Sequence, residues 1–145
     1  MLFDFQRHTQ NASSFLKEVA IELENPNDLA HAGRVLSAVL HCLRDMITPQ
    51  ESLDLISQLP LYIKAVYVNG WKIPEKPNRL KKLEDFLLSV KGYAGQTAEK
   101  DFGDIANTKR DVEAVFKVIK KHVSAGELKD VKSQLPEAIA ALLKS

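Results

Sequence analysis

The tetrapeptide SQLP occurs twice in this 145-residue chain, at residues 57–60 and again at residues 133–136. Adding 76 to each residue number aligns residues 35–67 with residues 111–143 without a gap, and ten of the 33 pairs are then identical. Average residue usage gives about two identities by chance. Two unrelated amphipathic helices would share scattered apolar positions, but not an unbroken tetrapeptide in register with them. The sequence therefore predicts an internal repeat.

The match extends upstream of this alignment. FLKEV at residues 15–19 resembles FLLSV at residues 86–90 with an offset of 71, so five residues are inserted before the second core. Each half is therefore expected to contain a helix, a loop and three further helical pieces. We place the first half at about residues 1–68, the linker at about 69–77 and the second half at about 78–145.

Hydrophobic periodicity identifies the central helix of each half. In RVLSAVLHCLRDMI, at residues 34–47, polar residues recur every three or four positions and apolar residues occupy most of the remaining circumference. This pattern is typical of a helix buried on most sides. DVEAVFKVIKKHV, at residues 111–123, repeats it.

The next helix in each half begins with a capping signal. TPQE at residues 48–51 and SAGE at residues 124–127 both place Ser or Thr three residues before Glu, as in a capping box.

SQLP follows each of these helices. Proline disfavours the helical conformation of the preceding residue and lacks an N–H, so we expect one helix to end near Gln58 and another to begin at Pro60. The predicted fold is all-α, with two tandem pseudosymmetric helical repeats forming one compact helical bundle domain over residues 1–145.

Two segments are expected to interrupt the helices. Asn69-Gly70 is a turn signal, and Pro74 and Pro77 prevent a continuous helix in the linker. A helical period resumes from about Asn78. A second loop, GYAGQTAEKDFGDIANTK at residues 92–109, is expected before the core of the second half.

The composition is that of an ordinary globular domain. The chain is 45% hydrophobic and 27% charged, with a net charge of +1, which gives no global argument for binding nucleic acid or an anionic membrane. The single Cys42 excludes an internal disulfide and fits a reducing cytoplasm. The first ten residues lack the pattern of a secretory leader, and no apolar stretch is long enough to span a bilayer. We expect a cytoplasmic protein that does not bind a membrane.

The sequence predicts no catalytic residues, no metal ligands and no cofactor. The four histidines, which are His8, His31, His41 and His122, include no pair at the i, i+4 spacing of a helical metal site. The triplet DFG at residues 101–103 lacks the glycine-rich and catalytic loops that accompany it in kinases, so we assign it no function. A non-catalytic role is favoured over an enzyme.

Five residues near the linker are candidate binding residues. Tyr67 and Trp71 are of the aromatic types enriched at interfaces, and Arg79, Lys81 and Lys82 form a basic cluster. The alternatives are structural. Trp71 is expected to cover apolar surface between the two halves. A cluster of basic residues is usually a solvated face.

The stretch RVLSAVLHCLRDMITPQESLDLISQLPLYIKAVYVNGW resembles the first half of a bacterial helical family of unknown function, the domain-of-unknown-function family numbered 2267. The second-half stretches DVEAVFKVIKKHV and SQLPEAIAALL are similar to that family's second half. The resemblance runs from about Phe15 to the C-terminus. It implies a duplicated, all-helical, bacterial and cytoplasmic protein, and it assigns no activity or site residues.

Two functions from different classes remain open. The first is a helical interaction module that binds a protein partner or a second copy of itself. The alternative is a regulator that binds a small ligand or an anion through the basic cluster. Salt separates them, because anion binding through Arg79, Lys81 and Lys82 weakens steeply with ionic strength.

Overall fold

The structure is a computed structural model that describes residues 3–143, and these residues contain helices and no strand. The ends of the two predicted halves, residues 1–2 and 144–145, lie outside this range. The α-helices are α1 (Phe5–Glu22), α2 (Leu29–Met46), α3 (Pro49–Ile56), α4 (Leu61–Val68), α5 (Leu83–Ala94), α6 (Ala98–Asp101), α7 (Ile105–His122), α8 (Ala125–Ser133) and α9 (Glu137–Ala140). Two short 3-10 helices, η1 (Gly95–Thr97) and η2 (Ala141–Leu143), complete the description. The predicted all-α fold is confirmed.

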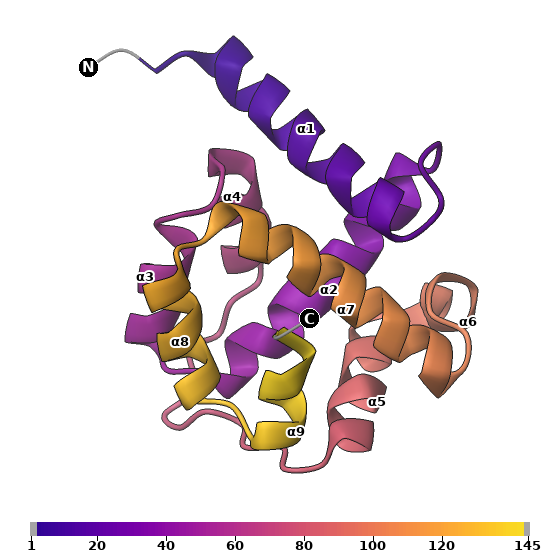
Figure 1. The fold of residues 1–145 in the computed structure, drawn as a ribbon, viewed down its shortest axis with the longest axis vertical. Coiled ribbons are helices and arrows are strands. Elements are labelled where there is room, and N and C mark those ends of the chain that lie inside the picture. The colour runs from indigo at the N-terminus through magenta and orange to yellow at the C-terminus, as the bar shows by residue number, and fades with distance from the viewer. Residues whose placement is uncertain (1–2, 144–145) are drawn as a thin grey trace.

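The long helices α2 and α7 run through the middle of the bundle (Figure 1). Helix α5 packs against both of them, and the C-terminal part of α1 also lies against both. The shorter α3 and α8 lie side by side at one edge of the bundle. The N-terminal part of α1 extends beyond the rest of the molecule.

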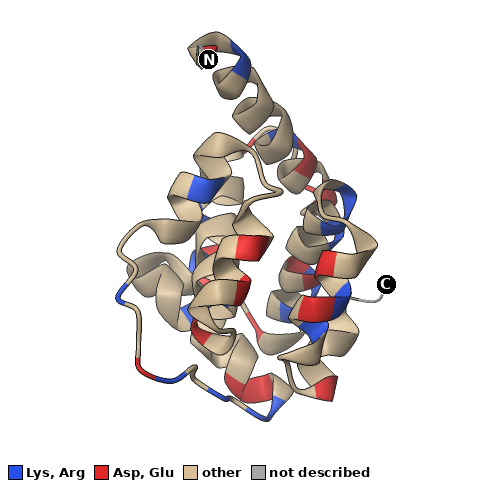
Figure 2. Ribbon diagram, turned by 90° about the vertical axis from the view of Figure 1, so that its left-hand side faces the viewer, with Lys and Arg blue, Asp and Glu red and all other residues tan. Residues whose placement is uncertain are grey.

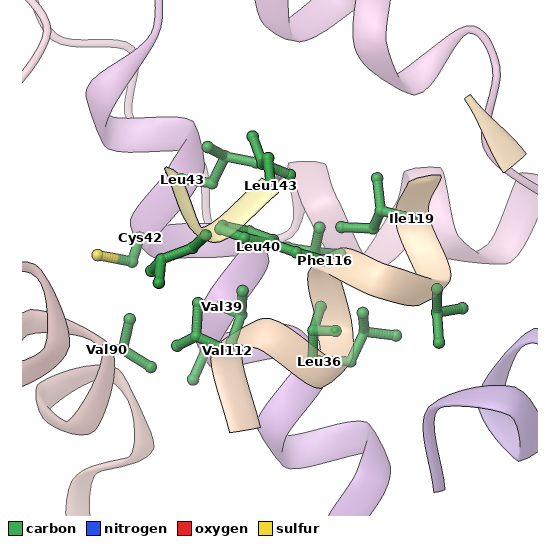
Figure 3. Packing of buried hydrophobic residues seen from close by; sticks show 14 of the residues in the cluster. Leu36, Val39, Leu40, Cys42, Leu43, Val90, Val112, Phe116, Ile119 and Leu143 are labelled. Atoms are coloured by element: carbon green, nitrogen blue, oxygen red, sulfur yellow. The ribbon is translucent and has the colours of Figure 1, made fainter. Parts of the chain in front are cut away.

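The hydrophobic core lies between these helices (Figure 3). Leu36, Val39, Leu40 and Leu43 of α2 face side chains of α7, and all of them are almost completely buried. The remaining labelled core residues include Val90, Val112, Phe116, Ile119 and Leu143. The apolar circumference predicted for both central helices is therefore what fills the core.

The helix bounds repeat with the spacing seen in the sequence. Helices α2 and α7 each have 18 residues, and both ends of α7 lie 76 positions after those of α2. Helix α8 begins 76 positions after α3, and α9 begins 76 positions after α4. The order of helical pieces predicted for each half is the order in the structure.

SQLP is a joint between two helices in both places. Ser57 Oγ donates a hydrogen bond to the Asp54 carbonyl oxygen at 2.6 Å, close to the end of α3. The equivalent bond, from Ser133 Oγ to the Asp130 carbonyl oxygen, is also 2.6 Å. The leucine of each copy is buried, and the proline directly precedes the next helix. Helix α3 ends at Ile56, close to the predicted end near Gln58, and α8 ends at Ser133, directly before Gln134.

The glutamine of each joint caps a helix in the other half. Gln134 Oε1 accepts a hydrogen bond from the Thr48 N–H, before α3, at 2.8 Å. Reciprocally, Gln58 Oε1 accepts from the Ser124 N–H, before α8, at 2.7 Å. An N-cap N–H has no partner within its own helix, so each bond satisfies a group that would otherwise need water. The two halves are thus tied together by the same pair of bonds made in both directions.

The predicted capping boxes are therefore only half formed. Thr48 Oγ1 accepts from the Glu51 N–H, and Ser124 Oγ accepts from the Glu127 N–H, both at 3.2 Å, as predicted. The return bond from each glutamate to the N-cap N–H is absent, because a glutamine from the other half occupies that donor.

Two expectations about the connecting segments are wrong. Helix α5 begins at Leu83 rather than near Asn78, because the Asn78 N–H bonds to the Asp45 carbonyl oxygen and holds this part of the linker against the end of α2. Residues 92–109, predicted to be a loop, are mostly helical. Asp101 and Phe102 anchor this segment in the bundle, and Gly103, with φ of +67°, provides the left-handed turn before α7.

Replacing either cross-capping glutamine is expected to destabilise the fold. Gln58→Ala and Gln134→Ala should each lower the free energy of unfolding by about 1 kcal/mol, because each leaves one N-cap N–H without its partner. Urea unfolding measures this. Gln96→Ala, at an exposed position in η1, is the matched control and should stay within about 0.5 kcal/mol of the parent. Equal stability of all three variants would show that the reciprocal bonds do not stabilise the fold.

Candidate functional site

Of the predicted binding residues, Tyr67 is part of the core. Its side chain is fully buried, and its hydroxyl shares a hydrogen bond of 2.6 Å with Ser52 Oγ. Burial raises the pKa of Tyr67 well above its usual range, so the phenol stays neutral. Tyr67 cannot contact a partner in this conformation. The prediction that it is a binding residue is therefore wrong for this structure, in which Tyr67 has a structural role.

Trp71 is half-buried and packs edge-on against Tyr67, with the ring centroids 5.9 Å apart. The guanidinium carbon of Arg44 lies 6.0 Å from the centre of its ring. Arg44 is itself buried and donates through Nη1 to the carbonyl oxygens of Tyr67 and Asn69, which end helix α4. Trp71 thus contacts Tyr67 and Arg44 of the first half and covers the end of α4. The structural alternative had placed its ring between the two halves, and these contacts do not reach the second half.

The basic residues Arg79, Lys81 and Lys82 are exposed on the non-helical segment between α4 and α5, which runs along the outside of the molecule (Figure 2). Arg79 Nη1 donates to the Gln134 carbonyl oxygen at 3.4 Å. The structure therefore separates the five predicted residues. The two aromatic side chains pack inward, and the three basic side chains face solvent.

A groove that the sequence analysis did not identify lies between α1, α2 and α4. Its volume is about 380 Å³, and its lining is mainly apolar, with contributions from Ala12, Leu16, Leu36, Tyr62, Ile63 and Val66. At one side, Thr9 Oγ1 and the Tyr62 hydroxyl share a hydrogen bond of 3.2 Å. The groove forms where helices from different parts of the first half meet, so no local pattern could predict it.

The projecting part of α1 continues from this groove. Among its residues 5–14, none is buried, and Phe5 is 72% exposed. Only from Phe15 onward does the helix contribute to the core. Between Phe5 and Phe15 the only formally charged side chain is Arg7. Exposed helix faces are normally rich in charged residues, so this composition is typical of a surface that becomes covered.

A second hollow, of about 410 Å³, lies beside α6 and is polar. Asp101, which is 2% exposed, accepts from Arg34 Nε at 2.8 Å and from Arg34 Nη2 at 3.0 Å. It also lies 3.0 Å from His31 Nδ1, a contact that orients the imidazole. Burial alone would raise the pKa of Asp101, but hydrogen bonds from Arg34, His31 and Thr97 outweigh burial and hold it well below its usual 3.8.

The polar residue types around this hollow are acids, amides and bases. Its lining residues include Asp28, Asn107 and Asp111, but no Ser, Thr or Cys that His31 could activate. The Asp101 cluster instead connects α6 to α2. The DFG triplet thus has a structural explanation: an aspartate that binds α2, a buried phenylalanine and a turn glycine.

Cys42 is buried at 1% exposure in the core. Burial raises the pKa of its thiol to about 12, so the thiol stays protonated at neutral pH. These surroundings favour an inert thiol over a reactive one.

Comparison with known proteins places the chain in a family. The model of the family described as "Uncharacterized conserved protein (DUF2267)" matches residues 12–142. The chain belongs to this family. No curated protein matches this chain. Within residues 3–143, no helix combines the length and the apolar character needed to cross a membrane.

The Asp101 cluster makes a prediction about acid stability. Asp101→Asn should lower the free energy of unfolding at pH 7 by about 2 kcal/mol, because it removes the charge that Arg34 and His31 bind. A depressed folded-state pKa contributes stability above pH 3.8, and this contribution is lost progressively as pH falls below that value. The difference between parent and variant should therefore shrink in urea unfolding at pH 3 and below. Asp85→Asn, exposed on α5, serves as the control. A deficit that persists unchanged at low pH would contradict this account.

Proposed function

We propose that this protein is a non-catalytic helical interaction module that self-associates through the projecting part of α1. The observation that carries the proposal is a helix end of ten residues, none of which is buried, that meets its own chain at the groove through Thr9 and Ala12. Helical segments of this length are marginally stable in water without tertiary contacts. A partner that covers residues 5–14 would supply the missing contacts.

The apolar stripe of α1 does not stop where the body of the protein stops. Phe5 and Ala12 follow the same helical face as Leu16 and Val19, which pack against the bundle. Phe5 therefore continues the stripe into solvent. Large exposed aromatic side chains next to an apolar groove are typical of contact surfaces.

A second copy of the chain is the partner that fits best, because one chain carries both halves of the contact. Each copy presents a projecting helix end with Phe5 and Ala12 on one face, and an adjoining apolar groove lined by Leu16, Tyr62 and Val66. Two copies can each place the α1 end across the groove of the other, which is the reciprocal arrangement of a two-fold dimer. The low charge of residues 5–14 means that no oppositely charged partner is needed.

We further infer that the two halves are tandem copies of one helical unit. The matching helix bounds and the reciprocal glutamine bonds support this inference, since contacts made identically in both directions are characteristic of a two-fold relation. Duplicated helical units commonly serve as binding scaffolds. The lone buried Cys42 supports a reducing compartment, and we propose a cytoplasmic, bacterial protein on that ground and on the family resemblance.

The alternative, anion binding at Arg79, Lys81 and Lys82, is supported by the exposure of all three side chains on one short segment. The two proposals respond oppositely to salt. Anion binding weakens as ionic strength rises, whereas an apolar α1 contact does not.

Self-association is testable by sedimentation velocity over a wide concentration range. The wild-type chain should form a dimer, and Phe5→Glu and Ala12→Glu should each shift it to monomer, because a carboxylate would be buried in the apolar contact. Leu88→Glu is the matched control: Leu88 is 49% exposed on α5, away from α1, and its replacement should leave the dimer intact. A wild-type chain that sediments as a monomer at every concentration would refute self-association.

A further inference from the structure

Two glutamates at equivalent positions have lost their usual partners. Glu51 and Glu127 are the third residues of α3 and α8, where a capping-box glutamate normally accepts a hydrogen bond from the N-cap N–H. Those N–H groups instead donate to Gln134 and Gln58 of the opposite halves. The cross-capping bonds therefore leave both carboxylates free for another role.

The free carboxylates are buried and lie close together between α3 and α8. Glu51 and Glu127 are each 8% exposed, and oxygens of these two residues and of Asp54 all lie within 4.8 Å of one another. In each glutamate, Oε2 is buried without any hydrogen-bond partner. A buried carboxylate oxygen without a partner is strongly destabilising, and a second carboxylate beside it adds repulsion.

No cation of the described chain neutralises this cluster. Within residues 3–143, none of the ion pairs includes Glu51, Asp54, Glu127 or Asp130. Asp130 of α8 contributes to the negative potential at Glu127 together with Asp54 of α3. Burial, followed by the adjoining Glu51 carboxyl, raises the pKa of Glu127 to about 8, so without a cation this carboxyl holds a proton at neutral pH.

Two arginines of the described chain bond to backbone carbonyl oxygens. Arg79 reaches the Gln134 carbonyl oxygen, and Arg44 donates through Nη1 to the carbonyl oxygens that end α4. Both halves nevertheless carry the same acidic pair at the same positions, Glu51 with Asp54 and Glu127 with Asp130. Repetition of an unfavourable arrangement in both halves indicates that it has a use.

We propose that Glu51, Asp54 and Glu127 bind a hard divalent cation, of the Mg²⁺ or Ca²⁺ type, between α3 and α8. The donor set consists entirely of carboxylate oxygens, which is the set that hard cations prefer over Zn²⁺ or copper. The cation accepts the unpartnered Oε2 atoms of both glutamates as ligands. Asp54 is exposed, so it provides a route from solvent, and water can complete the coordination.

The bound cation would act as a clamp between the two halves. Helices α3 and α8 meet at this interface, where the two glutamine bonds also cross. Cation binding is thereby linked to the stability of the interface, because an ion that binds only the folded chain shifts the unfolding equilibrium by mass action. No metal site was expected from the sequence, because histidine and cysteine spacings within single helices do not reveal a set of carboxylates from two separate helices.

Thermal unfolding of the chelator-treated full chain tests this proposal. At pH 8, with ionic strength matched by NaCl, adding MgCl₂, CaCl₂ or MnCl₂ to 10 mM should raise the Tm by about 4 °C or more with at least one of these ions, and the rise should saturate. Binding of Mn²⁺, followed by the loss of the free-ion signal in electron paramagnetic resonance, provides a readout independent of stability.

The variants separate a specific site from general screening. Glu51→Gln and Glu127→Gln should abolish the rise in Tm and weaken Mn²⁺ binding at least tenfold, while unfolding at a higher temperature than the cation-free parent. Glu84→Gln is the matched control, since Glu84 is an exposed glutamate in the first turn of α5, and it should respond like the parent.

Two results would overturn the proposal. If none of the three ions changes the Tm or binds, Glu51 and Glu127 share a proton instead of a cation. If Glu51→Gln and Glu127→Gln keep the full response, the ions bind elsewhere on the surface. The failure of this proposal would leave self-association through α1 untouched, because α1 does not contribute to the cluster.

Discussion

The reciprocal hydrogen bonds of Gln58 and Gln134 are the constraint on which the arrangement of the two halves depends. Each glutamine leaves the end of one short helix and accepts the first free N–H at the start of the other short helix. The bonds require α3 and α8 to lie side by side with the end of each near the start of the other. Helices α2 and α7, which lead directly into these short helices, then meet across the core. A repeated tetrapeptide thus carries three functions in each half: it ends a helix, starts the next one and binds the opposite half.

Much of the fold could be predicted from the sequence because its determinants are local. The two central helices follow from the spacing of apolar residues such as Leu43 and Ile119, and the helix starts at Thr48 and Ser124 follow from their side chains. The offset of 76 residues predicted which helices correspond. The direction of Gln58 and Gln134 could not be predicted, since a glutamine at a helix end can bond to its own backbone or to a distant one, and only the tertiary arrangement decides.

The candidate sites were harder to predict from the sequence, because they also depend on the tertiary arrangement of the helices. Tyr67 was predicted to bind a partner because aromatic residues favour interfaces. In the structure its side chain is buried in the core, where its hydroxyl shares a hydrogen bond with Ser52. Residues 92–109 were expected to form a loop, but Asp101 pairs with Arg34 of α2 at the end of the short helix α6. The exposed face of α1 did leave a signal: Arg7 is the only formally charged residue between Phe5 and Phe15, and this is visible in the sequence. The identity of Glu51 with Glu127 was also visible, but its meaning required the geometry of the interface.

The central claim is that each glutamine protects an amide in the opposite half, and hydrogen exchange resolved by residue with NMR tests it directly. In the wild-type chain, the Thr48 and Ser124 amides should exchange slowly although they lie at helix starts, where amides otherwise exchange fast. In Gln134→Ala the Thr48 amide should exchange much faster while Ser124 stays protected, and in Gln58→Ala the pattern should be reversed. If both amides exchange at unprotected rates in the wild-type chain, or if each variant affects only its own half, the reciprocal bonds do not hold the two halves together.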